Sequence, residues 1–149
     1  MKRRIFLLAA IMAVSACSEI PKDPEGTTER VRSAKILRVG IVAPGGTVSP
    51  GKQTEFLRRM ASASHARPIT KEGPAEILLE ELEEGKLDIV LGEFSTKSPW
   101  TPLVHFTPPL EEKVTRDGHS LLTAAVRNGE NEWVSIVHRE VAAVAGGGR

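Results

Sequence analysis

The side chains that could carry out catalysis or bind a metal lie scattered along this chain. The four histidines, His65, His105, His119 and His138, form no H-x-x-x-H or H-E-x-x-H pair, although a site built from histidines distant in sequence stays open. No serine lies in a G-x-S-x-G turn, and the acidic run at 80–84 fits the solvated face of a helix. No nucleophile, base and oxyanion hole come together. We therefore expect no enzyme activity, no cofactor and no metal.

The single cysteine, Cys17, ends a segment ordered like a secretory signal. A basic stretch at 2–4 precedes apolar residues at 5–14, and small residues stand just before the cysteine. About 10 apolar residues are too few to cross a bilayer, which takes about 20, so cleavage is favoured over an uncleaved anchor. No second cysteine exists for an internal disulfide. The segment resembles a bacterial lipoprotein lipobox, which implies cleavage before Cys17 and attachment of diacylglycerol and palmitate to this residue.

That resemblance has consequences for location. Two or more acyl chains anchor a protein stably, so the mature chain would sit on the periplasmic face of a bacterial membrane. Ser18 stands where aspartate would be, which favours the outer membrane in a Gram-negative host.

Without residues 1–16 the chain keeps about 130 residues, the size of one domain. The full chain has a formal net charge of +1, and without Lys2, Arg3 and Arg4 it is about −2; this near-neutral, mixed-sign balance argues against nucleic acid as a partner. We expect residues 17–34 to be the lipidated cysteine and a flexible tether, because prolines and a glycine interrupt a polar stretch. A single lobe follows at 35–145, and residues 146–149 form a disordered tail.

Hydrophobic patterning predicts helices that alternate with strands. The run at 87–91 is typical of a strand buried on both faces, and the helix before it should begin at Pro74, bury Ile77, Leu78 and Leu82, and end at Gly85. We expect a charged loop at 111–118. The order predicts an α/β fold with a parallel, layered sheet. The remaining expected elements are strands at 35–42, 103–106 and 119–126, an extended piece at 67–70, and helices at 54–63 and 130–144.

Several segments, in this order, resemble the family 3 periplasmic solute-binding proteins of ABC transporters. The resemblance implies a three-layer, mainly parallel sheet like one lobe of a type II periplasmic binding protein, and binding of a small solute for a transporter. Its pieces are LRVGIV (Leu37–Val42), EGKLDIVLGEF (Glu84–Phe94), VHFTPPL (Val104–Leu110) and AAVRNGENEW (Ala124–Trp133).

The chain departs from that family in two places. Only Glu111–Asp117 stands where a second lobe would be inserted, so the chain resembles a truncated, single-lobe form. The loop after the GKxD strand carries Lys97 rather than an arginine, and lysine lacks the planar fork that clamps a carboxylate. Two copies could rebuild the cleft as a homodimer.

Ligand sites in open α/β sheets lie outside the carboxyl ends of the strands. The expected contacts there are backbone N–H groups, hydroxyls, one cation and one aromatic wall. The alternative is that these loops are ordinary turns and the tryptophan covers the core. The candidate residues are Gly45, Gly46, Ser95, Thr96, Lys97 and Trp100.

Together these observations predict a lipid-anchored extracytoplasmic protein that binds a small solute, with an ABC transporter permease or a second copy as partner. The alternative is an envelope lipoprotein, outside transport, that binds a protein partner through its exposed lobe surface.

Overall fold

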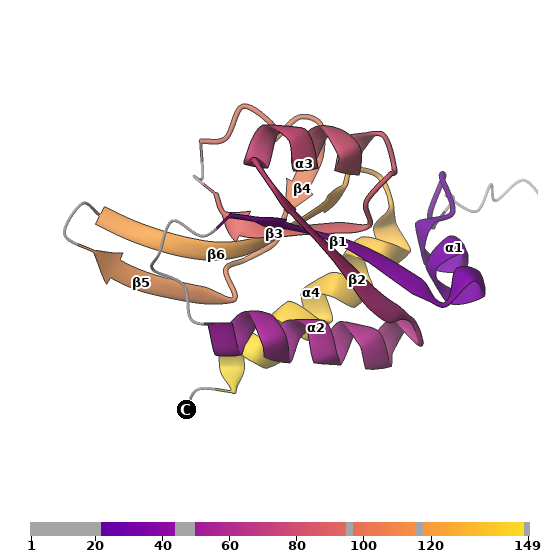
Figure 1. Ribbon diagram of the computed structural model, residues 1–149, viewed down its shortest axis with the longest axis horizontal. Helices are drawn as coiled ribbons and strands as arrows, with labels where there is room; N and C mark the ends of the chain where they lie inside the picture. Colours follow the sequence, from indigo (N-terminus) through magenta and orange to yellow (C-terminus); the bar gives the residue numbers. More distant parts are fainter. Residues whose placement is uncertain (1–21, 44–49, 95–96, 116–117, 148–149) are drawn as a thin grey trace, which may run out of the picture.

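The computed structural model describes residues 22–43, 50–94, 97–115 and 118–147 (Figure 1). Its elements are α1 (Thr27–Ala34), β1 (Ile36–Val42), α2 (Pro50–Ser64), β2 (Arg67–Gly73), α3 (Ala75–Glu83), β3 (Ile89–Glu93), β4 (Val104–Phe106), β5 (Glu111–Thr115), β6 (Gly118–Arg127) and α4 (Asn131–Gly146).

One six-stranded sheet runs through the middle of the molecule in the order β2-β1-β3-β6-β4, and β5 also pairs with β6. β1 is parallel to β2 and to β3, whereas β6 is antiparallel to β3, β4 and β5. Among these six described strands only β6 therefore runs against the common direction. α3 covers one face, and α2 and α4 cover the other (Figure 1). The expected three-layer α/β fold with a mostly parallel sheet is confirmed.

The chain winds outward from β1 in both directions. After α2 it returns beside β1 as β2, and after α3 it crosses to the far side of β1 as β3. The strand order thus reverses between β1 and β3, which is where open α/β sheets leave a crevice at their carboxyl edge.

Each face of the sheet has its own apolar core. Phe56 and Met60 of α2 and Trp133 of α4 fill the larger one. On the other face, α3 lies close to β1 because Gly40 has no side chain: a Cβ there would lie 3.2 Å from Leu78 Cδ2 of α3 and 2.8 Å from Leu87 Cδ1.

The start of α3 differs from the expectation by one residue. Pro74 has an extended ψ of 145° and is the N-cap, so the helix begins at Ala75. Leu78, Leu79 and Leu82 are buried, while Ile77 is 48% exposed. Placing Ile77 on the buried face is therefore wrong, and Leu79 takes that place.

A flexible tether is the wrong description for residues 22–34. This stretch contains α1, and two carboxylates tie it to α4. Glu130, fully buried, accepts hydrogen bonds from the backbone N–H groups of Glu25 and Thr27, both at 2.8 Å. Asp23 accepts from those of Glu132 and Trp133 at 2.8 and 3.1 Å. Each carboxylate thus satisfies the open N-terminal turn of the other segment, a role that composition alone does not reveal.

Asp88 fixes α1 to the sheet. Its side chain is 0% exposed and forms ion pairs with Arg30 at 2.6 Å and Arg38 at 2.7 Å. It also accepts the backbone N–H of Arg38 at 2.7 Å. These contacts make Asp88 a structural link between α1 and β1.

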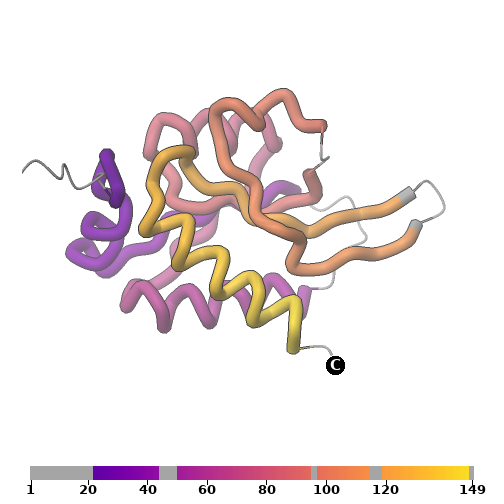
Figure 2. Tube along the Cα trace, turned by 180° about the vertical axis from the view of Figure 1, so that it is seen from behind, coloured from indigo at the N-terminus to yellow at the C-terminus, as the bar shows by residue number. Residues whose placement is uncertain are grey.

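The charged loop expected at 111–118 is wrong as well. Residues 111–115 form β5, which is antiparallel to β6. The pairing runs from Glu111 opposite Leu122 to Thr115 opposite Gly118. The pair projects from the body of the lobe as an arm (Figure 2). β5 is an edge strand, and edge strands tolerate charged side chains because one side of them meets water. The segment at which a second lobe would be inserted thus forms an edge strand of the same sheet.

The remaining boundaries differ by a few residues. α2 begins at Pro50 rather than at residue 54, β2 continues to Gly73, and α4 continues to Gly146, one residue into the expected tail. Among the described residues, no helix is both long enough and apolar enough to span a membrane.

Candidate functional site

The carboxyl edge of the sheet is shaped by a close approach of β1 and β3. A Cβ on Gly92 would lie 2.7 Å from Val42 Cγ2 and 3.1 Å from the ring of Phe94. A side chain at this position would collide with both neighbours, so the absence of a Cβ lets these strand ends converge. The convergence positions Phe94, the first residue after β3, over the sheet.

Most of the predicted ligand contacts lie outside the described residues. These are Gly45, Gly46, Ser95 and Thr96, and the lipidation site Cys17. Lys97 is exposed, and Trp100 packs against the apolar core below α3. Neither Lys97 nor Trp100 lines the cavity that the structure contains at this edge. The packing of Trp100 agrees with the alternative of an aromatic lid on the core.

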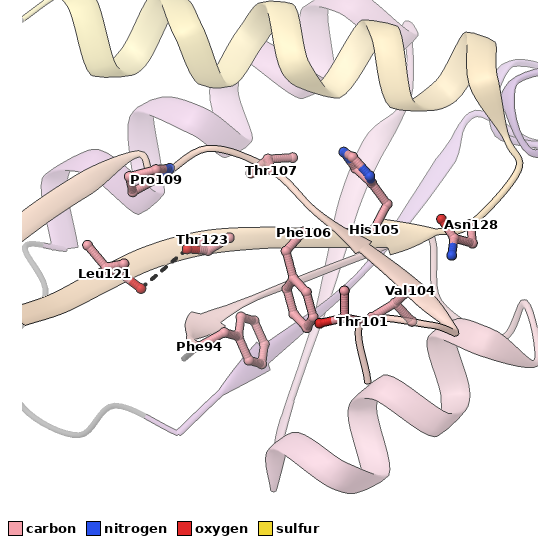
Figure 3. Close-up of a pocket in the computed structure, with 10 residues that line it drawn as sticks. All are labelled: Phe94, Thr101, Val104, His105, Phe106, Thr107, Pro109, Leu121, Thr123 and Asn128. Atoms are coloured by element: carbon pink, nitrogen blue, oxygen red, sulfur yellow. Dashed lines mark hydrogen bonds between the residues drawn. The ribbon is translucent and has the colours of Figure 1, made fainter. Parts of the chain in front are cut away.

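That cavity has a volume of about 420 Å³ and lies beside Phe94 (Figure 3). Its floor includes Thr123 of β6, which pairs with Gly92, so it is level with the carboxyl end of β3. Phe106 of β4 forms a second wall, with its ring centroid 5.0 Å from that of Phe94. A volume of this size suits a small organic molecule.

Four polar side chains share the cavity wall with the rings, and each of them already donates one hydrogen bond within the protein. Thr101 donates to the carbonyl of Ser98 at 2.8 Å, and Thr107 to that of Pro108 at 2.9 Å. Thr123 donates to a carbonyl on its own strand at 3.4 Å (Figure 3), and Asn128 Nδ2 donates to another at 3.1 Å. The groups that remain open are mainly oxygen acceptors.

A histidine pair borders the cavity. His105 of β4 and His138 of α4 bring their Nε2 atoms to 2.7 Å, so one ring donates to the other. Burial lowers the pKa of His105 below its ordinary value of 6.5, and the neighbouring His138 lowers it further. His105 is therefore neutral at pH 7. Within the described ranges, no three metal-ligating side chains come together.

Sequence reasoning missed both the cavity and the histidine pair. The two histidines are 33 positions apart, and no short motif connects them. The cavity had a weaker signal: Leu121 and Thr123 alternate with Leu122 and Ala124 of the larger core. They share a face of β6 with Ala125, which packs in the core below α3, but no residue of α3 lines the cavity. The aromatic residues that line the cavity are Phe94 and Phe106.

No protein-family model matches this chain, and curated protein sequences include no significant relative. Solved structures do match it. The arginine-bound form of domain 1 from TmArgBP has a TM-score of 0.63 at 14% identity, over 76% of this chain and 97% of that one. An ancestral cationic amino acid solute-binding protein, AncCDT-1, has a TM-score of 0.63 at 12% identity, covering 78% and 93% of the two chains.

A further match is an amino acid ABC transporter substrate-binding protein, AbpA, from Streptococcus pneumoniae bound to L-arginine. Its TM-score is 0.62 at 9% identity, over 78% of this chain and 91% of that one. AncCDT-1 is also described as a precursor of cyclohexadienyl dehydratase. At these identities the likeness establishes the fold, which is that of a single lobe of a periplasmic binding protein.

Proposed function

We propose that this chain is a lipid-anchored, extracytoplasmic solute-binding protein that works with one lobe. The cavity of about 420 Å³ at the carboxyl edge carries the proposal, because this is the edge where open α/β sheets bind ligands. Two aromatic rings and a few polar side chains line it, a composition common to small-molecule sites.

The neighbours support a single lobe as a sufficient unit. Domain 1 of TmArgBP is an isolated domain in an arginine-bound form, and the alignment covers 97% of it. A second lobe is therefore not required for a domain of this fold to hold a small ligand. In this chain the arm of β5 and β6 stands where the family resemblance would place a second lobe, and the cavity lies on the single lobe.

The anchoring part of the proposal rests on residues 1–17 of the sequence. Intact-mass analysis of the full chain from a bacterial host should give a protein that begins at Cys17 and carries acyl groups. A Cys17→Ser variant should keep the uncleaved mass and leave the detergent phase in a phase-separation assay. An unacylated wild-type chain would contradict the anchor without touching the binding role.

Ligand binding is tested by thermal unfolding of the purified full chain against amino acids, amines, small carboxylates and sugars. A ligand at 100 times its Kd adds about 2.7 kcal/mol to the free energy of unfolding, which raises Tm measurably. Leu121→Trp should fill the cavity and abolish that rise, whereas Val114→Trp, at a position 81% exposed on the adjacent strand, should keep it. A panel that leaves Tm unchanged would refute the solute-binding role.

A further inference from the structure

The cavity presents the faces and edges of two phenylalanine rings to whatever occupies it. Phe94 and Phe106 both line it, with their ring planes at 49° to one another (Figure 3). The face of an aromatic ring carries partial negative charge and attracts organic cations within about 6 Å of its centroid. Two rings at this angle form two sides of a site for such a group.

The polar side chains of the wall also favour a cation, because most of their open groups are oxygen acceptors. The hydroxyls of Thr101 and Thr107 and one N–H of the Asn128 amide donate to backbone carbonyls. The oxygen of Thr107 additionally accepts the backbone N–H of Ala124 at 3.3 Å. The oxygens of Thr101, Thr123 and Asn128 remain as acceptors, and the second N–H of Asn128 remains as a donor. A wall with more open acceptors than donors suits a ligand that brings its own N–H groups.

The wall also gives a carboxylate no cationic partner. No described residue that lines the cavity is an arginine or a lysine. His105, the remaining titratable group of the wall, has a lowered pKa because of burial. Placing a carboxylate here would cost desolvation without a compensating charge.

We propose that the cavity selects a small organic cation that lacks a carboxylate, such as an alkyl ammonium or a guanidinium-bearing amine. This inference rests on the solute-binding role proposed above and names its ligand class. It separates the chain from its structural neighbours, whose names specify arginine or cationic amino acids.

The test uses two matched pairs of probes in calorimetric titrations of the full chain at pH 7.5. Agmatine and arginine share a guanidinium chain and differ by the carboxylate, while butylamine and 1-butanol differ by the charge. We expect agmatine to bind at least about tenfold more tightly than arginine, a difference of about 1.4 kcal/mol. Butylamine should bind more tightly than 1-butanol by a similar factor.

Three variants locate the effect in the cavity. Asn128→Asp adds a negative charge at the wall and should strengthen agmatine binding severalfold. Thr123→Val removes an acceptor at nearly constant volume and should weaken it. Thr54→Val is the matched control, because Thr54 on α2 also donates to a carbonyl, at 2.9 Å, but lies outside the cavity; binding should not change.

Each other outcome is decisive. Tighter binding of arginine than agmatine, or equal binding of butylamine and 1-butanol, would overturn the ligand class and leave the solute-binding role in place. Binding that is indifferent to both Asn128→Asp and Thr123→Val would put the ligand elsewhere and overturn the inference. If no compound in the wider panel changes Tm, the solute-binding role itself fails.

Discussion

Replacing Asp88 by asparagine should lower the free energy of unfolding of the lobe, because it removes one buried negative charge. The amide would keep the shape of the side chain, but it would leave the guanidinium groups of Arg30 and Arg38 without their counter-charge. In the native protein these groups lie 2.6 and 2.7 Å from the carboxylate, whose side chain is 0% exposed. Removing one partner of a fully buried ion pair costs about 3–5 kcal/mol.

The partial exposure of the two arginines lowers this cost. The side chains of Arg30 and Arg38 are 36% and 33% exposed, so water can replace part of what the carboxylate provided. We therefore expect Asp88→Asn to lower the free energy of unfolding by about 2–3 kcal/mol. In a domain of this size the loss corresponds to a decrease in Tm of roughly 10 °C.

Urea unfolding followed by circular dichroism measures the loss, and amide hydrogen exchange locates it. The amides of α1 should exchange faster in Asp88→Asn, because Asp88 holds Arg30 of that helix. Glu55→Gln is the control: Glu55 also forms a 2.7 Å ion pair, with Arg58, but that pair lies on the surface, and its loss should have no measurable effect. A change below about 0.5 kcal/mol in Asp88→Asn, within the range of ordinary surface substitutions, would refute the reasoning.

Three other described contacts can be tested in the same way. Because the folded state lowers the pKa of His105, the unfolded chain binds more protons than the folded chain as the pH falls. The free energy of unfolding should therefore keep its full value above pH 6.5 and decrease below it. A His105→Gln variant with an unchanged pH profile in thermal melts would contradict this. Gly92→Ala should lower the free energy of unfolding by about 1–3 kcal/mol through its contact with Val42, while Gly51→Ala, with open space around it in α2, should be neutral or stabilising in urea titrations. Asp23→Ala should cost about 1 kcal/mol and speed exchange at the first amides of α4, and unaltered exchange there would count against the capping role.

The alternation of helices and strands could be predicted from the sequence, because the local signals there agree with the tertiary packing. The structure contains the buried strand around Ile89 and a positive φ of 74° at Gly85, where the preceding helix was expected to end. It also contains the expected alternation of helix and strand. In each case the residue's chemistry alone restricts the conformation: a positive φ favours glycine, and a run without polar side chains needs two covered faces.

The expectations failed where long-range polar contacts decide the structure. Residues 22–34 look like a linker because their partners, Asp88 and Glu130, lie far along the chain. β5 looks like a loop because a charged edge strand has no apolar alternation of its own. The cavity depends on how far α3 extends over its face of the sheet, and that follows from three-dimensional packing rather than from spacing. The loop residues chosen as ligand contacts stay a prediction.

The capping of α1 by Glu130 has a consequence for how the lobe stands at a membrane. The carbonyl of Lys22 accepts the backbone N–H of Glu132 at 3.1 Å, so the described chain starts against α4. α1 lies at one end of the molecule and the β5–β6 arm at the other (Figure 1). In the anchored form proposed above, the α1 end would therefore face the membrane and the arm would face away from it.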